Sequence, residues 1–220
     1  MESRTSHQKP KTTLLNRFER FTKSSVWPAY VGCLLAFLYA VFVRFYHAAG
    51  GEIGFPGEIE AGMDQFYMAS YLAGLLIMFC GFALIALVKP WSKTVPHYVP
   101  IIGGKKIPPF LLLIPTLSGT AFLLAHGISG ILTKTLHLLG LITLRFPGWT
   151  ELDIGQLVLW DLLFYEPWFL SMGILAGLTA AHYAQGSNIR PSTFRIGTIL
   201  FVFVVLILTG WVLFLIFQKN

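Results

Sequence analysis

Apolar residues gather in five stretches of the chain, and polar loops separate these stretches. A helix needs roughly 20 apolar residues to cross a bilayer, so each stretch predicts a membrane-spanning helix. The predicted spans cover residues 26–45, 66–88, 109–132, 157–183 and 196–217. The expected fold is therefore all-α, an integral membrane bundle of five transmembrane helices in one domain, residues 26–220.

Residues 1–25 are polar and basic and contain Pro10, which predicts a cytoplasmic tail. A short interfacial helix is expected from Leu14 to Thr22. A cleaved signal peptide is the competing interpretation of the first span, but that stretch is long and four more spans follow it. An uncleaved first helix is favoured.

Composition supports a membrane class. Of 220 residues, 55% are apolar and 12% are charged, and the mean hydropathy is +0.68. So few charges exclude a soluble enzyme, and they make nucleic acid an unexpected partner although the pI is near 9.4. The expected surroundings are the lipid bilayer and other membrane proteins.

The basic residues also predict the orientation. With the N-terminus inside, the tail and inner loops carry twelve Lys and Arg residues, whereas three lie outside and Arg44 lies at the outer edge. Cytoplasmic loops are enriched in such residues. The N-terminus is therefore expected in the cytoplasm and the C-terminus outside.

The two cysteines, Cys33 and Cys80, lie in neighbouring spans at similar depth. Their spacing matches neither a disulfide framework nor a metal site. Small apolar filler is the expected role, and an intramembrane thiol pair is the alternative.

Four ionisable residues fall within the predicted spans: Arg44, His126, Asp161 and Glu166. A charge in the bilayer costs about 2.5–3.5 kcal/mol on insertion scales, so each is a candidate site residue. Arg44 continues a row of small residues spaced four apart and is expected to face the bundle. His126 also shares its side of the helix with small residues.

Glu166 lies within about 20° of Gly173 and Gly177, which form a GxxxG pair, so it is expected to point into a helix contact. Pro167 follows it and removes a backbone donor, which predicts a kink. All four ionisable residues belong to the outer half of the bundle. Together they predict an outward-facing polar pocket with Trp168 in its wall, and with a Gly-rich loop, residues 47–57, over its mouth.

The expected ligand of this pocket is a small molecule or a lipid head group, with Glu166 and Arg44 as the central pair and His126 as a proton partner. The sequence specifies no cofactor and no catalytic residue. Three other readings stay open: a purely structural Arg44–Glu166 pair, Arg44 and Asp161 as interfacial residues, and haem between His126 and His47. For function, the alternatives are a membrane enzyme acting on lipid or quinone and a non-catalytic subunit of a membrane complex.

In the outer loop after the third span, residues 136–146 predict an interfacial or re-entrant helix.

Three segments, residues 45–54, 86–91 and 163–170, read Phe-Tyr-His-Ala-Ala-Gly-Gly-Glu-Ile-Gly, Ala-Leu-Val-Lys-Pro-Trp and Leu-Phe-Tyr-Glu-Pro-Trp-Phe-Leu. They resemble a family of small bacterial polytopic membrane proteins, domain of unknown function 3995. The resemblance implies a bacterial cytoplasmic membrane and no defined activity. This chain departs from the expected family pattern with His47 in place of Trp and Glu166 in place of Asp. The motif residues are Gly50, Gly51, Pro90, Trp91, Glu166, Pro167 and Trp168.

Overall fold

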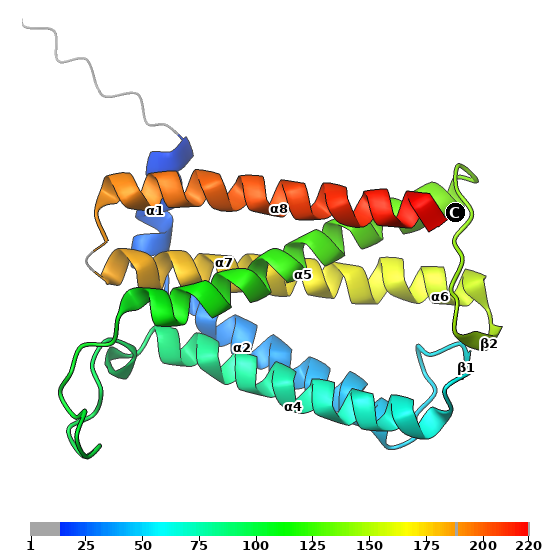
Figure 1. The fold of residues 1–220 in the computed structure, drawn as a ribbon, viewed down its shortest axis with the longest axis horizontal. Coiled ribbons are helices and arrows are strands. Elements are labelled where there is room, and N and C mark those ends of the chain that lie inside the picture. The colour runs from blue at the N-terminus through cyan, green and yellow to red at the C-terminus, as the bar shows by residue number, and fades with distance from the viewer. Residues whose placement is uncertain (1–13, 188, 220) are drawn as a thin grey trace, which may run out of the picture.

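The computed structural model describes residues 14–187 and 189–219. Within them, five continuous helical segments are long and apolar enough to cross a membrane: Trp27–Ala48, Met63–Leu87, Pro109–Leu138, Ile154–Gly186 and Pro191–Gln218. These segments confirm the five predicted helices. The fold is almost entirely helical (Figure 1).

Two of the five segments contain a widened, π-helical turn. The first comprises α2 (Trp27–Tyr39), the π turn η1 (Ala40–Phe45) and α3 (Tyr46–Ala48). The fourth comprises α6 (Ile154–Trp160), the π turn η3 (Asp161–Tyr165) and α7 (Glu166–Gly186). The other three are α4 (Met63–Leu87), α5 (Pro109–Leu138) and α8 (Pro191–Lys219).

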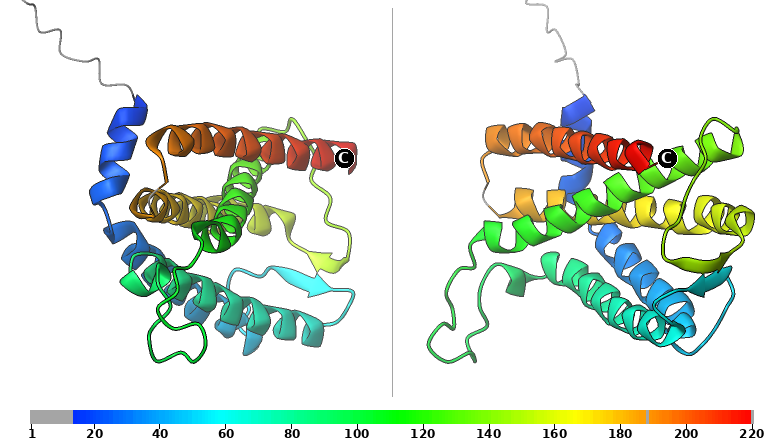
Figure 2. Two further views of the ribbon diagram at one scale, coloured as in Figure 1. Left: turned by 60° about the vertical axis from the view of Figure 1, so that its left-hand side comes forward. Right: turned by 45° about the vertical axis from the view of Figure 1, so that its right-hand side comes forward.

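The helices form three layers, with α2 and α4 on one side, α5 crossing α7 in the middle, and α8 on the other side (Figures 1 and 2). Glycines permit the closest contacts, as is usual between membrane helices. A Cβ atom at Gly127 of α5 would lie 2.9 Å from the backbone nitrogen of Leu170, and one at Gly81 of α4 would lie 2.8 Å from Cβ of Ala36. Helix α8 is peripheral, since 11% of its most apolar window is buried against 28–33% in the other four segments.

The two ends of the bundle differ. At one end, which we call the tail end, α1 (Leu14–Ser24) occupies the position of the expected short helix and lies across the bundle (Figure 1). Its Thr22 is buried, and the Thr22 carbonyl is 2.9 Å from Nδ1 of His182. The loop between α4 and α5 also lies at this end and begins with the short 3₁₀ turn η2 (Pro90–Ser92). In this turn Trp91 is exposed, whereas Ser92 is buried and its carbonyl accepts a hydrogen bond from Tyr183.

The opposite end, which we call the ribbon end, carries a two-stranded antiparallel ribbon. Strand β1 (Gly57–Ile59) pairs with β2 (Trp149–Leu152), so the loop after the first span is tied to the loop before the fourth. The sequence analysis did not predict this ribbon. Strands this short lack the alternating pattern that marks a strand.

The expected interfacial or re-entrant helix at residues 136–146 is wrong. Leu136, His137 and Leu138 are instead the last turn of α5. Gly140 ends that helix with φ = 70°, and the Leu141 N–H donates to the Leu136 carbonyl at 3.0 Å. This is a Schellman C-cap, which glycine favours because it lacks a Cβ atom. Cys33 and Cys80 are both free thiols.

Candidate functional site

A buried ionic cluster joins α5 to the fourth segment near the ribbon end. Nζ of Lys134 lies 2.5 Å from Oε1 of Glu166 and 3.1 Å from Oδ2 of Asp161. The Glu166 side chain is 2% exposed and that of Lys134 is 12% exposed. We call Lys134, Asp161, Glu166 and the adjacent His126 the Lys134 cluster. One ammonium group thus bridges two carboxylates, which leaves these three residues with a formal charge of −1 before His126 is counted.

The π turn η3 brings the two carboxylates together. In a regular α-helix, residues five apart point about 140° away from each other. Here the Glu166 N–H bonds to the Asp161 carbonyl, an i to i+5 bond, so the turn is one residue wider. Pro167 has no N–H with which to restore the regular pattern to Leu163. The predicted backbone disturbance at Pro167 therefore takes the form of a π turn, which places both carboxylates within reach of one lysine.

Gly130 provides the space for the Glu166 side chain. A Cβ atom at Gly130 would lie 2.0 Å from the Glu166 carboxyl carbon, far closer than any contact allows. Further along the same interface, Gly173 lies against Leu124, and a Cβ at Gly177 would lie 3.3 Å from Cγ2 of Thr120. The glycines of α5 and α7 therefore set the distance at which the ion pair forms.

His126 lies at the edge of the cluster. Its Nε2 atom is 3.7 Å from Oε2 of Glu166, and its side chain is 44% exposed. The imidazole packs edge-on against Phe169 and stacks on Phe122, whose side chain is also exposed. Within the described residues, Oε2 of Glu166 has no hydrogen-bond partner. His126 is thus the member of the cluster whose side chain is accessible from the surface of the bundle.

Arg44 is not the ionic partner of Glu166 in the described part of the chain, because Lys134 takes that place. The guanidinium of Arg44 lies 5.5 Å from the ring centre of Tyr39. Tyr39 interacts electrostatically with Arg44, Asp161 and Glu166, so Arg44 belongs to the same neighbourhood. Its Nε atom is buried and lacks a hydrogen-bond partner among the described residues. Trp168 stacks on the ring of Tyr39, with the two ring centres 5.3 Å apart.

The Gly-rich loop folds back onto the fourth helical segment beside the cluster. The hydroxyl of Tyr165, at the end of η3, donates to the Gly54 carbonyl at 3.1 Å. His47 is buried beneath this loop, with Nε2 3.0 Å from the Ile53 carbonyl, and it packs against Phe55 and Phe66 rather than against His126. His47 therefore stabilises the folded loop through these contacts.

Glycine suits Gly50 and Gly51 for two different structural reasons. Gly50 turns the chain with φ = 88°, a conformation that disfavours a side chain. Gly51 lies on the Tyr46 ring, where a Cβ atom would come within 2.2 Å of Cζ. Both glycines fix the path of the loop out of the first segment.

Lys134 is the site residue that the sequence analysis missed, because the third span was ended at Leu132. The residues from Leu132 to Leu139 contain neither Gly nor Pro, so nothing ends the helix before Gly140. Lys134 lies one turn beyond Gly130 and hence on nearly the same side of α5. Helix continuity, rather than hydropathy, was the signal that could have found it.

Comparison with known proteins leaves the family resemblance as a prediction: no family model, curated protein or solved structure matches this chain.

Proposed function

We propose that this chain is a multi-pass protein of the bacterial cell membrane, and that its Lys134 cluster binds, or carries across the bilayer, a small polar molecule or a lipid head group. In this proposal the tail end faces the cytoplasm and the ribbon end faces outward, as the distribution of Lys and Arg predicts. The Gly-rich loop and the β1–β2 ribbon then close the outer side of the site.

The observation that carries the proposal is Oε2 of Glu166, which has no hydrogen-bond partner among the described residues and lies 3.7 Å from Nε2 of His126. A carboxylate within a membrane span is costly, and a missing hydrogen bond on a buried polar atom adds about 1–3 kcal/mol. Buried polar groups that serve packing alone are normally satisfied. Oε2 of Glu166 is not, although Oε1 binds Lys134. It is a free acceptor for the N–H or O–H group of a ligand.

Two more buried polar atoms that lack a hydrogen-bond partner in the described part of the chain support the same site. These are Nε of Arg44 and Oγ of Ser70. The Cβ atom of Arg44 packs against α4 one turn from Ser70, since a Cβ at Gly74 would lie 3.2 Å from it. A guanidinium suits a carboxylate or phosphate, and a carboxylate suits an ammonium. Arg44 and Glu166 together fit a ligand that carries both charges.

The two π turns support a site that changes shape. Arg44 lies in η1 and Asp161 lies in η3. Single π turns are frequent at functional sites, and a change to regular α-helix would rotate the residues on one side relative to those on the other. Such a rotation would separate Asp161 from Lys134 and open the closed cluster.

The test is native mass spectrometry of protein released gently from its own membrane. We expect the wild-type chain to retain a stoichiometric added mass, and Glu166→Gln to lose it while staying folded. Glu58→Gln, which removes an exposed carboxylate of β1 at the same end, is the matched control and should retain it. Equal retention by Glu166→Gln and wild type would overturn the proposal.

A membrane enzyme acting on lipid or quinone is the second candidate, and the exposure of His126 favours it. A substrate moving in the bilayer would meet His126 between Phe122 and Phe169, with Glu166 behind it. His126 and Glu166 would then act as general acid and base. Conversion of the released ligand by wild type, but by neither His126→Gln nor Glu166→Gln, would distinguish this function from binding alone.

A further inference from the structure

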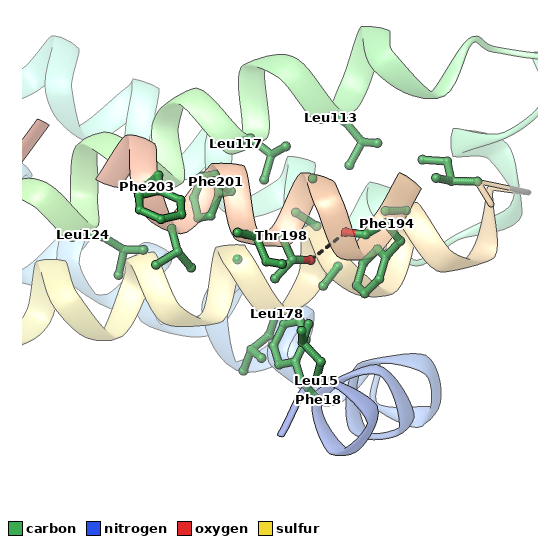
Figure 3. A pocket seen from close by; sticks show the side chains of 18 of the residues that line it. Leu15, Phe18, Leu113, Leu117, Leu124, Leu178, Phe194, Thr198, Phe201 and Phe203 are labelled. Carbon is green, nitrogen blue, oxygen red and sulfur yellow. Dashed lines mark hydrogen bonds between the residues drawn. The ribbon is translucent and has the colours of Figure 1, made fainter. Parts of the chain in front are cut away.

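A long apolar cavity lies away from the Lys134 cluster, between α8 and the middle layer. It is a groove of about 710 Å³ whose walls come from α1, α5, α7 and α8. Figure 3 shows Leu15, Phe18, Leu178, Phe194, Thr198 and Phe203 around it. No residue of the Lys134 cluster lines it.

The groove is apolar along its whole length. Thr193 and Thr198 are the polar side chains of its lining, and the Thr198 hydroxyl already donates to the Phe194 carbonyl at 2.9 Å (Figure 3). It therefore offers hydrophobic contact and almost no hydrogen bonding. An occupant must be a hydrocarbon over the part that enters.

The length and the volume of the groove favour one acyl chain. The lining of α8 extends from Thr193 to Phe203, which is about 15 Å of helix. That is half of the roughly 30 Å hydrocarbon core, the depth of one leaflet. A cavity of about 150 Å³ holds benzene, so a chain of well over a dozen carbons fits.

Charge at the mouth identifies the head group. Helix α1 crosses the groove at the tail end, where Phe18 stacks on Phe194. Arg17, Arg20 and Lys23 of α1 are exposed beside it, as is Arg190 at the start of the last segment. Glu19 is the acidic residue of α1, and Arg195 already neutralises it at 2.6 Å. This rim attracts anionic lipids.

We infer that the groove between α1, α7 and α8 holds one acyl chain of an anionic phospholipid whose head group lies on the basic side of α1. The lipid would fill the space that separates α8 from α7 and would stabilise a helix that is otherwise attached mainly through α5. This site needs the membrane but not the Lys134 cluster, because the two share no residue.

The test uses two glycines of α8. A Cβ atom at either Gly197 or Gly210 would meet no atom within 4 Å, but Gly197 lines the groove and Gly210 does not. Purified full-length protein is titrated with dioleoyl-phosphatidylglycerol and, separately, with dioleoyl-phosphatidylcholine, and the complexes are counted by native mass spectrometry. We expect wild type and Gly210→Leu to retain one phosphatidylglycerol, and Gly197→Leu to bind it at least tenfold more weakly.

The head group is tested by Arg17→Gln/Arg20→Gln, which should lower phosphatidylglycerol binding to the level of phosphatidylcholine. Lys105→Gln/Lys106→Gln, exposed at the same end, should leave it unchanged. If Gly197→Leu does not fold, Val202→Trp blocks the groove at another exposed position. Wild-type binding by a folded groove variant, equal binding of the two lipids, or a second chain seated on α8 would overturn the inference. The Glu166→Gln protein should still bind this lipid, which separates the site from the proposed function.

Discussion

Lys134 and Glu166 face each other across the crossing of α5 and α7, with Nζ 2.5 Å from Oε1. The contact depends on Gly130, which leaves room for the carboxylate, and on η3, which brings Asp161 to the same lysine. Three local features of the sequence therefore meet in one buried charge arrangement.

Removing the lysine alone should be strongly destabilising. Lys134→Met leaves the buried Glu166 carboxylate and the half-buried Asp161 carboxylate without their lysine, and breaking a buried pair in this way costs about 3–5 kcal/mol. The free energy of unfolding, measured in mixed detergent micelles, should recover by at least half in Lys134→Met/Glu166→Gln. Lys105→Met, at an exposed loop position, is the control and should change little. Additive effects of Lys134→Met and Glu166→Gln would contradict the pairing.

Gly130→Ala should destabilise the protein by about 1–3 kcal/mol, because the new methyl group would overlap the Glu166 carboxyl group. Gly119 lies on the same helix, and a Cβ atom there would meet nothing within 4 Å. Gly119→Ala should thus stabilise α5 by about 0.5–1 kcal/mol. Thermal unfolding of the two variants checks the prediction, and equal effects would refute it.

Pro167→Ala should weaken the link between Asp161 and Lys134. The alanine regains the N–H that can bond to Leu163, which favours a regular α-helical turn over η3. The coupling energy between Lys134 and Asp161, obtained from a double-mutant cycle, should fall in the Pro167→Ala background. An unchanged coupling energy would mean that the π turn does not depend on the proline.

The contact between α1 and α8 predicts a pH dependence outside the spans. The hydrogen bond from Arg195 holds the pKa of Glu19 below its ordinary value of 4.5. The pair therefore stabilises the folded state above that value, and the contribution disappears as pH falls through the lowered pKa. The Glu19 side chain is 19% exposed and that of Arg195 is 47% exposed, so the effect at pH 7 should stay below about 1 kcal/mol. The difference in melting temperature between wild type and Glu19→Gln should shrink from pH 7 to pH 3; a constant difference would contradict it.

Hydropathy was sufficient to predict the five helices, because length and apolar composition determine them. It also identified Glu166 as a residue turned into a helix contact. It could not find Lys134, since hydropathy places a lysine outside a span even when the helix continues. Nor could it find η3 or the β1–β2 ribbon. A π turn depends on one missing backbone donor at Pro167, and the ribbon depends on two segments about 90 residues apart that meet only in the folded chain.

The central claim is that the Lys134 cluster binds a ligand rather than only joining two helices. The most direct measurement is ligand retention by the variant Lys134→Met/Asp161→Asn/Glu166→Gln, which removes the charges together and leaves no buried carboxylate unpaired in the cluster. Removal of a complete buried ionic group is often neutral for stability, so this variant should fold like wild type. We predict that native mass spectrometry will show a folded protein without the added mass that wild type carries. A folded variant that retains the added mass at the wild-type level would contradict the account.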